Sequence, residues 1–442
     1  MKISLSDHFD YKKMIRFTLP SVIMMIFTSI YGVVDGFFVS NFVGKTPFAA
    51  VNFIFPFLML LGPVGFMFGT GGGALIAKTL GEGDNKKANR LFSMFVYITI
   101  LCSIVISVVS FIFLPSIARM LGATGELLEN CVIYGRILIL SLPFLMIQFE
   151  FQSFFITAEK PKLGLYATIA SGVTNMVLDA LFMAVFRWGI TGAAAATAIS
   201  QVVGGIIPLV YFGRNNTSLL KLGKFEFDGR SLLKACTNGS SELMSNISMS
   251  LVGILYNIQL MKFAGENGVA AYGVLMYVNF VFISAFIGFS VGIAPVIGFH
   301  FGAQNHNELK GLLRKSTVII LISSVVMLIL GEALAYPLSY IFVGYDKLLM
   351  DMTLNGFIIY SFSYLFSGFA IFGSSFFTAL NDGVTSAVIS FLRTLVFQVA
   401  AVMILPMFLK LDGIWFSVVV SEVMAVIITV LFMIIKKNKY HY

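Results

Sequence analysis

Charged residues are scarce in this sequence. Asp, Glu, Lys and Arg make up 11% of its 442 residues, whereas soluble globular proteins carry about 25%. The three cysteines, Cys102, Cys131 and Cys236, form no CxxC pair, which argues against a disulfide framework and a cysteine zinc site. The four histidines also lack metal-ligand spacing. We therefore predict neither a metal site nor a cofactor.

Apolar residues dominate instead, at 58% of the chain, with 46 phenylalanines and 40 glycines. A membrane span needs about 20 mostly apolar residues, and the sequence predicts an all-α membrane protein with twelve such spans. These spans are 14–42, 48–77, 91–114, 131–157, 163–186, 190–212, 234–262, 267–298, 316–342, 352–378, 384–408 and 412–435.

The distribution of basic residues predicts the orientation of the spans. If the N-terminus is cytoplasmic, 21 of the 29 Lys and Arg residues lie in segments on the inside and seven lie outside. Cytoplasmic segments of membrane proteins carry such an excess, so we expect both termini in the cytoplasm. This bias also accounts for the net charge of +8 without a nucleic-acid partner.

The two halves of the chain form an internal repeat. A shift of 221 residues brings Gly44 onto Gly265, and Gly81 onto Gly302 in the loop after a second span. Because each half has six spans, the halves share one orientation, as in a parallel repeat related by an axis along the membrane normal. We predict two six-helix lobes around a central cavity, with lobes at 1–213 and 234–442 and a cytoplasmic linker at 214–233.

Two acids inside predicted spans of the first half have no acidic counterpart at the equivalent positions of the second half. Asp35 and Asp179 are matched in the second half by Tyr256 and Ala400. A charge at bilayer depth costs about 2.5–3.5 kcal/mol on insertion scales, so an intramembrane acid indicates a functional site. Polar residues confined to one lobe are better candidates for a specific task than residues shared by both lobes.

Three polar residues of the first half are expected to lie at one depth, and a fourth shares a helix face with one of them. Asp35, Asp179 and Thr197 are each about seven residues, or roughly 10 Å, from the outer end of a span. Asn175 precedes Asp179 by one helical turn and shares its face. These oxygens could hold Na⁺, or the two acids could bind a proton because they cannot easily both ionise. Asn175 and Thr197 could instead link helices by hydrogen bonds.

Other polar residues within the spans have several possible roles. Glu150 and Glu242 could relay protons, contact a substrate or support packing. Arg393 should pair with an acid or reach toward the cytoplasm. Pro20 lies in the first turns of span one, where it could permit bending or mark the start of a helix.

Three stretches make the chain resemble the multidrug and toxic compound extrusion (MATE) family, including its MepA-like bacterial branch. They are Gly32-Val-Val-Asp35-Gly-Phe-Phe-Val-Ser40, Ala77-Lys-Thr-Leu-Gly81-Glu-Gly-Asp-Asn85, and Asn175-Met-Val-Leu-Asp179 followed by Gly189-Ile-Thr-Gly-Ala-Ala-Ala-Ala-Thr197. The resemblance covers the whole chain. It implies an antiporter that takes in H⁺ or Na⁺ and exports drug-like, often cationic, amphipathic molecules. We also expect a monomer in the bacterial inner membrane.

The resemblance also implies roles for individual residues. Asp35, Asn175, Asp179 and Thr197 match the cation site of the first lobe in bacterial members of the family. Pro20 matches a first-helix proline associated with bending. Some members carry acids in the seventh, eighth and tenth spans for cation binding. This chain has no acid between 352 and 378, and this departure from the family pattern argues against a second-lobe ion site.

Two other functions compete with export. A flippase for a lipid-linked precursor shares the two-lobe layout but commonly has several cations in its cavity, and here only Arg393 is clearly mid-span. An intramembrane aspartyl protease needs GxGD and YD motifs. Gly81-Glu-Gly-Asp84 and Tyr345-Asp346 fit these motifs but fall in loops on opposite membrane faces. We therefore expect a transporter without catalytic residues.

Overall fold

The computed structural model describes residues 3–442, apart from the side chain of Lys45, and within that range it contains helices and no strands. Lys2, one of the basic residues counted above, lies outside the range. The helices are α1 (Tyr11–Phe42), α2 (Lys45–Leu61), α3 (Pro63–Gly81), α4 (Asn85–Met120), α5 (Gly125–Thr157), α6 (Pro161–Asp179), η1 (Ala180–Val185), α7 (Gly189–Gly213), α8 (Gly229–Gly302), α9 (His306–Val343), α10 (Lys347–Ser361), α11 (Tyr364–Ala379), α12 (Gly383–Phe391), η2 (Leu392–Val396) and α13 (Phe397–Tyr440).

Two of these helices each contain two membrane spans. In α8 the backbone leaves the helical conformation at Gly265, and the rings of Tyr256 and Tyr272 stack with centroids 5.1 Å apart. Sixteen residues of straight helix would separate these residues by about 24 Å, so the chain folds back at Gly265. In α13 the backbone breaks in the same way at Lys410. Together with the other apolar helices of the described range, these two reversals confirm the twelve predicted spans.

Several spans are less regular than predicted. The second span is divided at Gly62, where α2 ends and Pro63 starts α3, although Gly62 itself keeps helical φ and ψ angles. The tenth span is broken between α10 and α11, whose axes differ by 49°. Two spans contain π-helical turns, η1 and η2. Gly81 and Gly302 are the last residues of α3 and α8. The prediction that both glycines lie in loops was therefore wrong, because each still belongs to the end of its helix.

The 221-residue repeat also governs the backbone. Three pairs of residues at this spacing take the left-handed conformation that lets a helical chain turn back. They are Gly44 (φ 96°) with Gly265 (62°), Gly83 (85°) with Gln304 (55°), and Gly189 (58°) with Lys410 (52°). Glycine adopts this conformation without steric cost. The second half keeps the turns even where it has lost the glycine.

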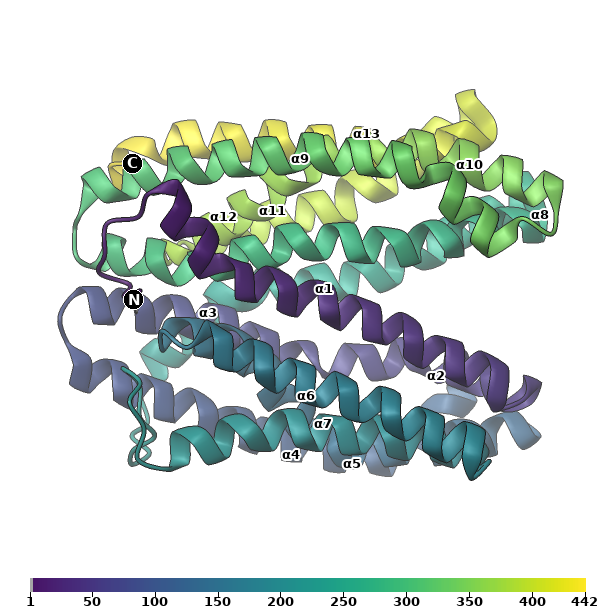
Figure 1. The fold of residues 1–442 in the computed structure, drawn as a ribbon, viewed down its shortest axis with the longest axis horizontal. Helices are drawn as coiled ribbons and strands as arrows, with labels where there is room; N and C mark the ends of the chain where they lie inside the picture. The colour runs from purple at the N-terminus through teal and green to yellow at the C-terminus, as the bar shows by residue number, and fades with distance from the viewer. Residues whose placement is uncertain (1–2) are drawn as a thin grey trace.

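The two halves of the chain lie side by side as two lobes (Figure 1), with both termini at the same end of the molecule. We call this end the termini face. Close to it, the halves meet backbone to backbone: a Cβ on Gly81 would overlap the Phe299 carbonyl oxygen, and a Cβ on Gly302 would overlap that of Lys78. Both pairs obey the 221-residue shift, so this contact lies on the pseudo-two-fold axis.

The contact between the lobes weakens away from the termini face. In the half of α1 nearer that face, a Cβ on Gly288 of α8 would meet the backbone of Ser21 and Val22 at 2.6–3.0 Å. Nearer the opposite end of α1, a Cβ on Gly36 would come no closer than 4.0 Å to Tyr277. The lobes are therefore packed tightly near the termini face and loosely near the other.

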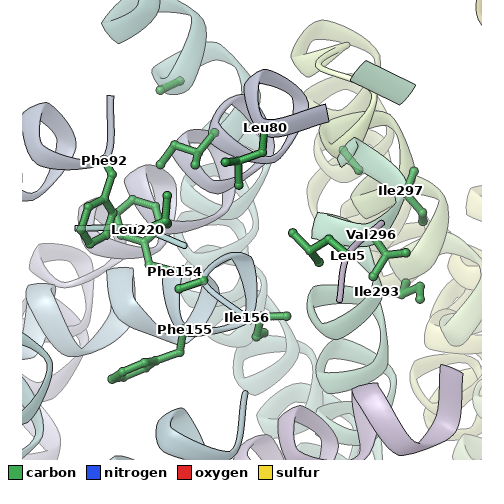
Figure 2. Close-up of a cluster of buried hydrophobic side chains, with 14 of the residues drawn as sticks. Leu5, Leu80, Phe92, Phe154, Phe155, Ile156, Leu220, Ile293, Val296 and Ile297 are labelled. Atoms are coloured by element: carbon green, nitrogen blue, oxygen red, sulfur yellow. The ribbon is translucent and has the colours of Figure 1, made fainter. Parts of the chain in front are cut away.

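A hydrophobic cluster joins the lobes and the N-terminal segment at the termini face. Leu5 is fully buried, and it shares this cluster with Leu80 of α3 and with Ile293 and Val296 of α8. Figure 2 shows Leu5 beside Ile293 and Val296. Burial of apolar surface from three parts of the chain stabilises this end of the molecule.

Candidate functional site

The polar residues predicted to share one depth come together in the first lobe. The Thr197 hydroxyl donates to an Asp35 carboxylate oxygen at 3.5 Å. The side chains of Asp179 and Asn175 also lie against the Asp35 carboxylate. Asp179 and Asn175 are buried, whereas Asp35 and Thr197 are partly exposed. Asp35 therefore forms the accessible side of the cluster and Asp179 its interior.

Three helices hold the cluster. Asp35 comes from α1, Asn175 and Asp179 from α6, and Thr197 from α7. At Gly172 a Cβ would come within 2.5 Å of the Phe27 ring and 2.9 Å of the Tyr31 ring. The missing side chain thus lets α1 approach α6 just before Asn175. Because small residues permit close helix packing, Gly172 sets the distance across which the two acids face each other.

Asp179 is the last residue of α6, and the π-helical turn η1 begins at the next position. Single π turns inside α-helices occur frequently at functional sites. The second π-helical segment, η2, contains Arg393, but it does not occupy the position equivalent to η1 under the 221-residue shift. Each lobe therefore has one span with a π-helical turn at an ionisable group: η1 directly follows Asp179, and η2 contains Arg393.

The cluster offers oxygens that the described residues leave unused. Both carboxylate oxygens of Asp179 and the amide oxygen of Asn175 are buried without a hydrogen-bonding partner among the residues of the structure. Buried polar atoms without partners are costly. Two neighbouring carboxylates also repel each other when both are ionised, so a proton or a cation between them lowers the energy of the site.

Two tyrosines near the cluster were missed at the sequence level. Tyr31 lies close enough to Asp35 to interact with it electrostatically, and Tyr134 lies close to both Asp35 and Asp179. Tyr31 precedes Asp35 by one helical turn, which is a usable signal. Tyr134 comes from α5, and no spacing in the sequence links that helix to the acids.

Glu150 does not belong to this cluster. It lies seven residues before the end of α5 at the termini face, whereas Asp35 lies seven residues before the opposite end of α1, so each is about 10 Å from a different end of the lobe. The Glu150 carboxylate faces Thr99 of α4 and is fully buried. Depth alone separates it from the acids of the cluster.

The polar residues of the second lobe form a separate group. The Arg393 guanidinium donates to both carboxylate oxygens of Glu422, with its Nε 2.9 Å from one and its Nη2 2.8 Å from the other. The prediction that Arg393 pairs with an acid is confirmed. Glu242 lies within electrostatic reach of Arg393, so it too is in a group distinct from the Asp35 cluster.

Pro20 lies inside α1, nine residues after the helix begins at Tyr11. The alternative that it marks a helix start is therefore wrong. Its missing N–H leaves one backbone hydrogen bond of the helix unmade. The neighbouring residues Ser21 and Val22 pack directly on Gly288 of α8, so this weak point lies where the lobes touch.

A family model, described as MatE, matches residues 20–181 and again residues 243–404. The chain belongs to the MatE family. The two matches fall one in each half, in agreement with the internal repeat, and the first one contains Asp35, Asn175 and Asp179.

Curated MatE relatives resemble the chain over most of its length. The multidrug export protein MepA of Staphylococcus saprophyticus is 24% identical over 436 residues, covering 97% of this chain and 94% of that protein. The MepA of Staphylococcus haemolyticus is 26% identical over 366 residues, covering 81% and 80%.

Solved structures share the fold. One described as the outward-facing conformation of a multidrug resistance MATE family transporter superposes with a TM-score of 0.93 at 22% identity, covering 98% of this chain and 97% of that chain. A MATE in the straight conformation gives 0.91 at 22% identity, covering 98% of both chains. The all-α, two-lobed membrane fold predicted from the sequence is confirmed.

Proposed function

We propose that this protein is an antiporter that takes up H⁺ or Na⁺ and exports amphipathic, often cationic, drug-like compounds. The juxtaposition of Asp35, Asp179, Asn175 and Thr197 carries the proposal, because it gathers acceptor oxygens around two acids inside the first lobe. The relatives named as multidrug export proteins support the class of cargo. No cofactor and no catalytic residue is part of the proposal.

The coupling works through charge. A cation that reaches Asp35 neutralises the repulsion between Asp35 and Asp179 and satisfies the buried oxygens of Asp179 and Asn175. The ion therefore favours one arrangement of the lobes, and the drug must favour the other, because a ligand with equal affinity for both states shifts nothing.

Alternating access requires the tight end of the molecule to open. The Gly81 and Gly302 contacts would separate, and so would the hydrogen bond from the Asn381 amide to the Ala74 carbonyl, 3.2 Å long, which also crosses between the lobes. We propose rigid-body rocking of residues 1–213 against 234–442 around a central cavity, with 214–233 as the linker. Pro20 would let α1 bend.

The membrane placement follows from the charge distribution. We propose a monomer in the bacterial inner membrane. The termini face should lie in the cytoplasm, since most basic residues lie in segments on that side. Glu150, between the cluster and the termini face, and Glu242 in the second lobe are candidates for proton relay or substrate contact.

The decisive test is efflux of a fluorescent cation from cells. Asp35→Asn and Asp179→Asn remove the negative charge with little change in shape, so each should reduce efflux about tenfold or more, the scale of a coupling free energy between two ligands. Asp351→Asn, at an exposed position on α10, is the matched control and should transport normally. Wild-type efflux by both cluster variants would refute the proposal.

The coupling ion is tested in membrane vesicles with an imposed pH gradient and, separately, an imposed Na⁺ gradient. Drug uptake that follows one gradient and disappears in Asp35→Asn identifies the ion. Uptake that follows neither gradient would contradict antiport.

The flippase alternative receives less support from the second lobe. A site for a lipid pyrophosphate needs uncompensated positive charge, and the Arg393 guanidinium is already bound by Glu422 at 2.8 Å. Recovery of lipid-linked sugar translocation in a flippase-deficient strain would reverse this preference.

A further inference from the structure

The segment between the lobes is fastened to α4 at regular steps. The Lys221 amide donates to Asn89 at 2.6 Å, the Gly223 amide donates to Ser93 at 2.8 Å, and the Tyr97 hydroxyl donates to the Gly223 carbonyl at 3.2 Å. Asn89, Ser93 and Tyr97 are spaced by four residues, so they follow one face of α4. The segment is therefore a built part of the termini face.

This fastening leaves large apolar side chains uncovered. Phe225 is 52% exposed and Phe227 is 68% exposed. Beneath them, the same side of α4 continues with exposed Tyr97, Leu101 and Val105, which marks it as lipid-facing in a membrane-spanning helix. Tyrosine at the edge of such a surface is typical of the membrane–water interface, and the exposed rings of Phe225 and Phe227 add apolar surface beside Tyr97.

Two hollows of opposite character lie along this face of α4. One, of about 510 Å³, is lined by Tyr97, Ile98, Leu101, Lys224 and Phe225 together with Gly223. The other, of about 560 Å³ and nearer the start of α4, is lined by Lys86, Arg90, Glu226 and two asparagines. A polar end and an apolar end thus follow each other in the direction from the termini face into the membrane.

The charge of the surface is positive. Arg90 is paired with Glu226 at 2.9 Å, but Lys86, Lys221 and Lys224 are exposed and form no ion pair with any of the residues that the structure describes. Free ammonium groups beside an apolar hollow are complementary to a molecule with an anionic head and a hydrocarbon tail.

We propose that this surface is a binding site for an anionic phospholipid of the adjoining leaflet. The phosphate lies against Lys221, Lys224 and Lys86, and an acyl chain follows Tyr97 and Leu101 into the bilayer. A soluble phosphate fits less well, because the apolar hollow opens onto the lipid-facing side of α4. The bound lipid ties the segment joining the two lobes to the membrane. The site is distinct from the Asp35 cluster and independent of the proposed antiport.

Native mass spectrometry of the purified full-length protein tests the preference. Phosphatidylglycerol should remain bound more tightly than phosphatidylcholine with the same acyl chains. Lys221→Gln/Lys224→Gln should lower that affinity roughly 30-fold, since each of the two basic residues near an anionic membrane surface contributes on the order of 1 kcal/mol. Lys437→Gln/Lys439→Gln removes the same charge from exposed positions at the end of α13 and should leave binding unchanged. Equal binding of the two lipids, or an equal loss in both double variants, would overturn the proposal.

Photo-crosslinking locates the lipid and does not depend on the lysine variants. A photoreactive phenylalanine analogue replaces Phe225 in nanodiscs that contain equal amounts of both lipids, and in a second sample it replaces Phe342, an exposed residue at the far end of α9. The ratio of phosphatidylglycerol to phosphatidylcholine adducts should be several-fold higher at 225 than at 342. Equal ratios would refute the site. Loss of the 225 adduct in the presence of millimolar glycerol 3-phosphate would show that the site selects only the phosphate group, which would overturn the proposal of a lipid site.

Discussion

Single residues in this protein show how much a charge depends on its partner inside a membrane lobe. Arg393 is 17% exposed and Glu422 is 5% exposed, and their pairing is bidentate. Breaking a buried ion pair leaves an uncompensated charge, whereas replacing both partners removes the charges together. The sequence indicated that Arg393 needs an acid, but it offered several acids, and only the packing of α13 onto η2 selected Glu422.

This pairing predicts non-additive stability effects. Arg393→Gln and Glu422→Gln should each lower the free energy of unfolding by about 3 kcal/mol, and the double variant should lose clearly less than the sum of the single losses. Thermal unfolding of the four proteins in one detergent measures this. Strictly additive losses would mean that the two side chains do not interact.

The charge of Asp382, in the loop between α11 and α12 at the termini face, also depends on its partners. Burial by itself would raise the pKa of Asp382, but hydrogen bonds from Tyr440 and Thr385 and the nearby Lys436 ammonium outweigh it and hold the pKa below its usual value. The Tyr440 hydroxyl donates to the carboxylate at 2.8 Å, so the end of α13 is docked on this loop.

The lowered pKa of Asp382 predicts acid lability. Its ionised form contributes stability that is complete above the ordinary carboxyl pKa of about 3.9 and is lost as the pH falls through the lower folded-state value. The melting temperature of the wild type should therefore fall faster than that of Asp382→Asn between neutral pH and about pH 3. At neutral pH the variant should be less stable by about 1 kcal/mol. Parallel pH profiles would contradict this role.

At the scale of elements, the repeat is conserved in turns and close contacts more than in side chains. Gly81 and Gly302 sit at equivalent ends of α3 and α8, and each abuts a backbone carbonyl of the other lobe. The sequence placed both glycines in register, but it could not show that they face one another, because that depends on how the two lobes pack.

Alanine at either glycine should disturb this contact. The added methyl group overlaps backbone, which cannot move as a side chain can, so Gly81→Ala and Gly302→Ala should each weaken the closed termini face by about 1–3 kcal/mol. Cysteine labelling near this contact should become faster and drug efflux should fall. Gly311→Ala, on α9 where only the flexible end of Lys315 is near, should be neutral or slightly stabilising. Equal behaviour of all three variants would rule out a specific contact.

For the molecule as a whole, the N-terminal segment before α1 bridges both lobes. The Leu5 amide donates to Glu159 at 2.8 Å in the first half of the chain, and the Phe9 amide donates to Glu308 at 2.9 Å in the second half. The ring of His8 lies 2.6 Å from Glu308, and Lys315 donates to the Phe9 carbonyl. Contacts to both lobes oppose their separation at this face.

Weakening one end of this bridge should loosen it without unfolding the protein. Glu308→Gln replaces a charge-assisted hydrogen bond, so amide exchange in residues 4–9 should accelerate roughly tenfold. Lys310→Gln, at an exposed position on the same helix, serves as the control and should not change exchange. Unchanged exchange in Glu308→Gln would mean that the buried side chains of Leu5 and Phe9 hold the segment alone.

Composition, the lengths of the apolar stretches and the 221-residue shift determined the twelve spans, the repeat and the presence of intramembrane acids, since the cost of placing polar groups in hydrocarbon acts on each segment separately. Equal depth along the helices was enough to group Asp35 with Asp179 and Thr197. The tertiary structure decided the rest: it brought Tyr134 to the cluster, matched Arg393 with Glu422 and fastened residues 221–223 to α4. These depend on which helix faces meet, and that is set by packing between segments far apart in the chain, which no local pattern encodes.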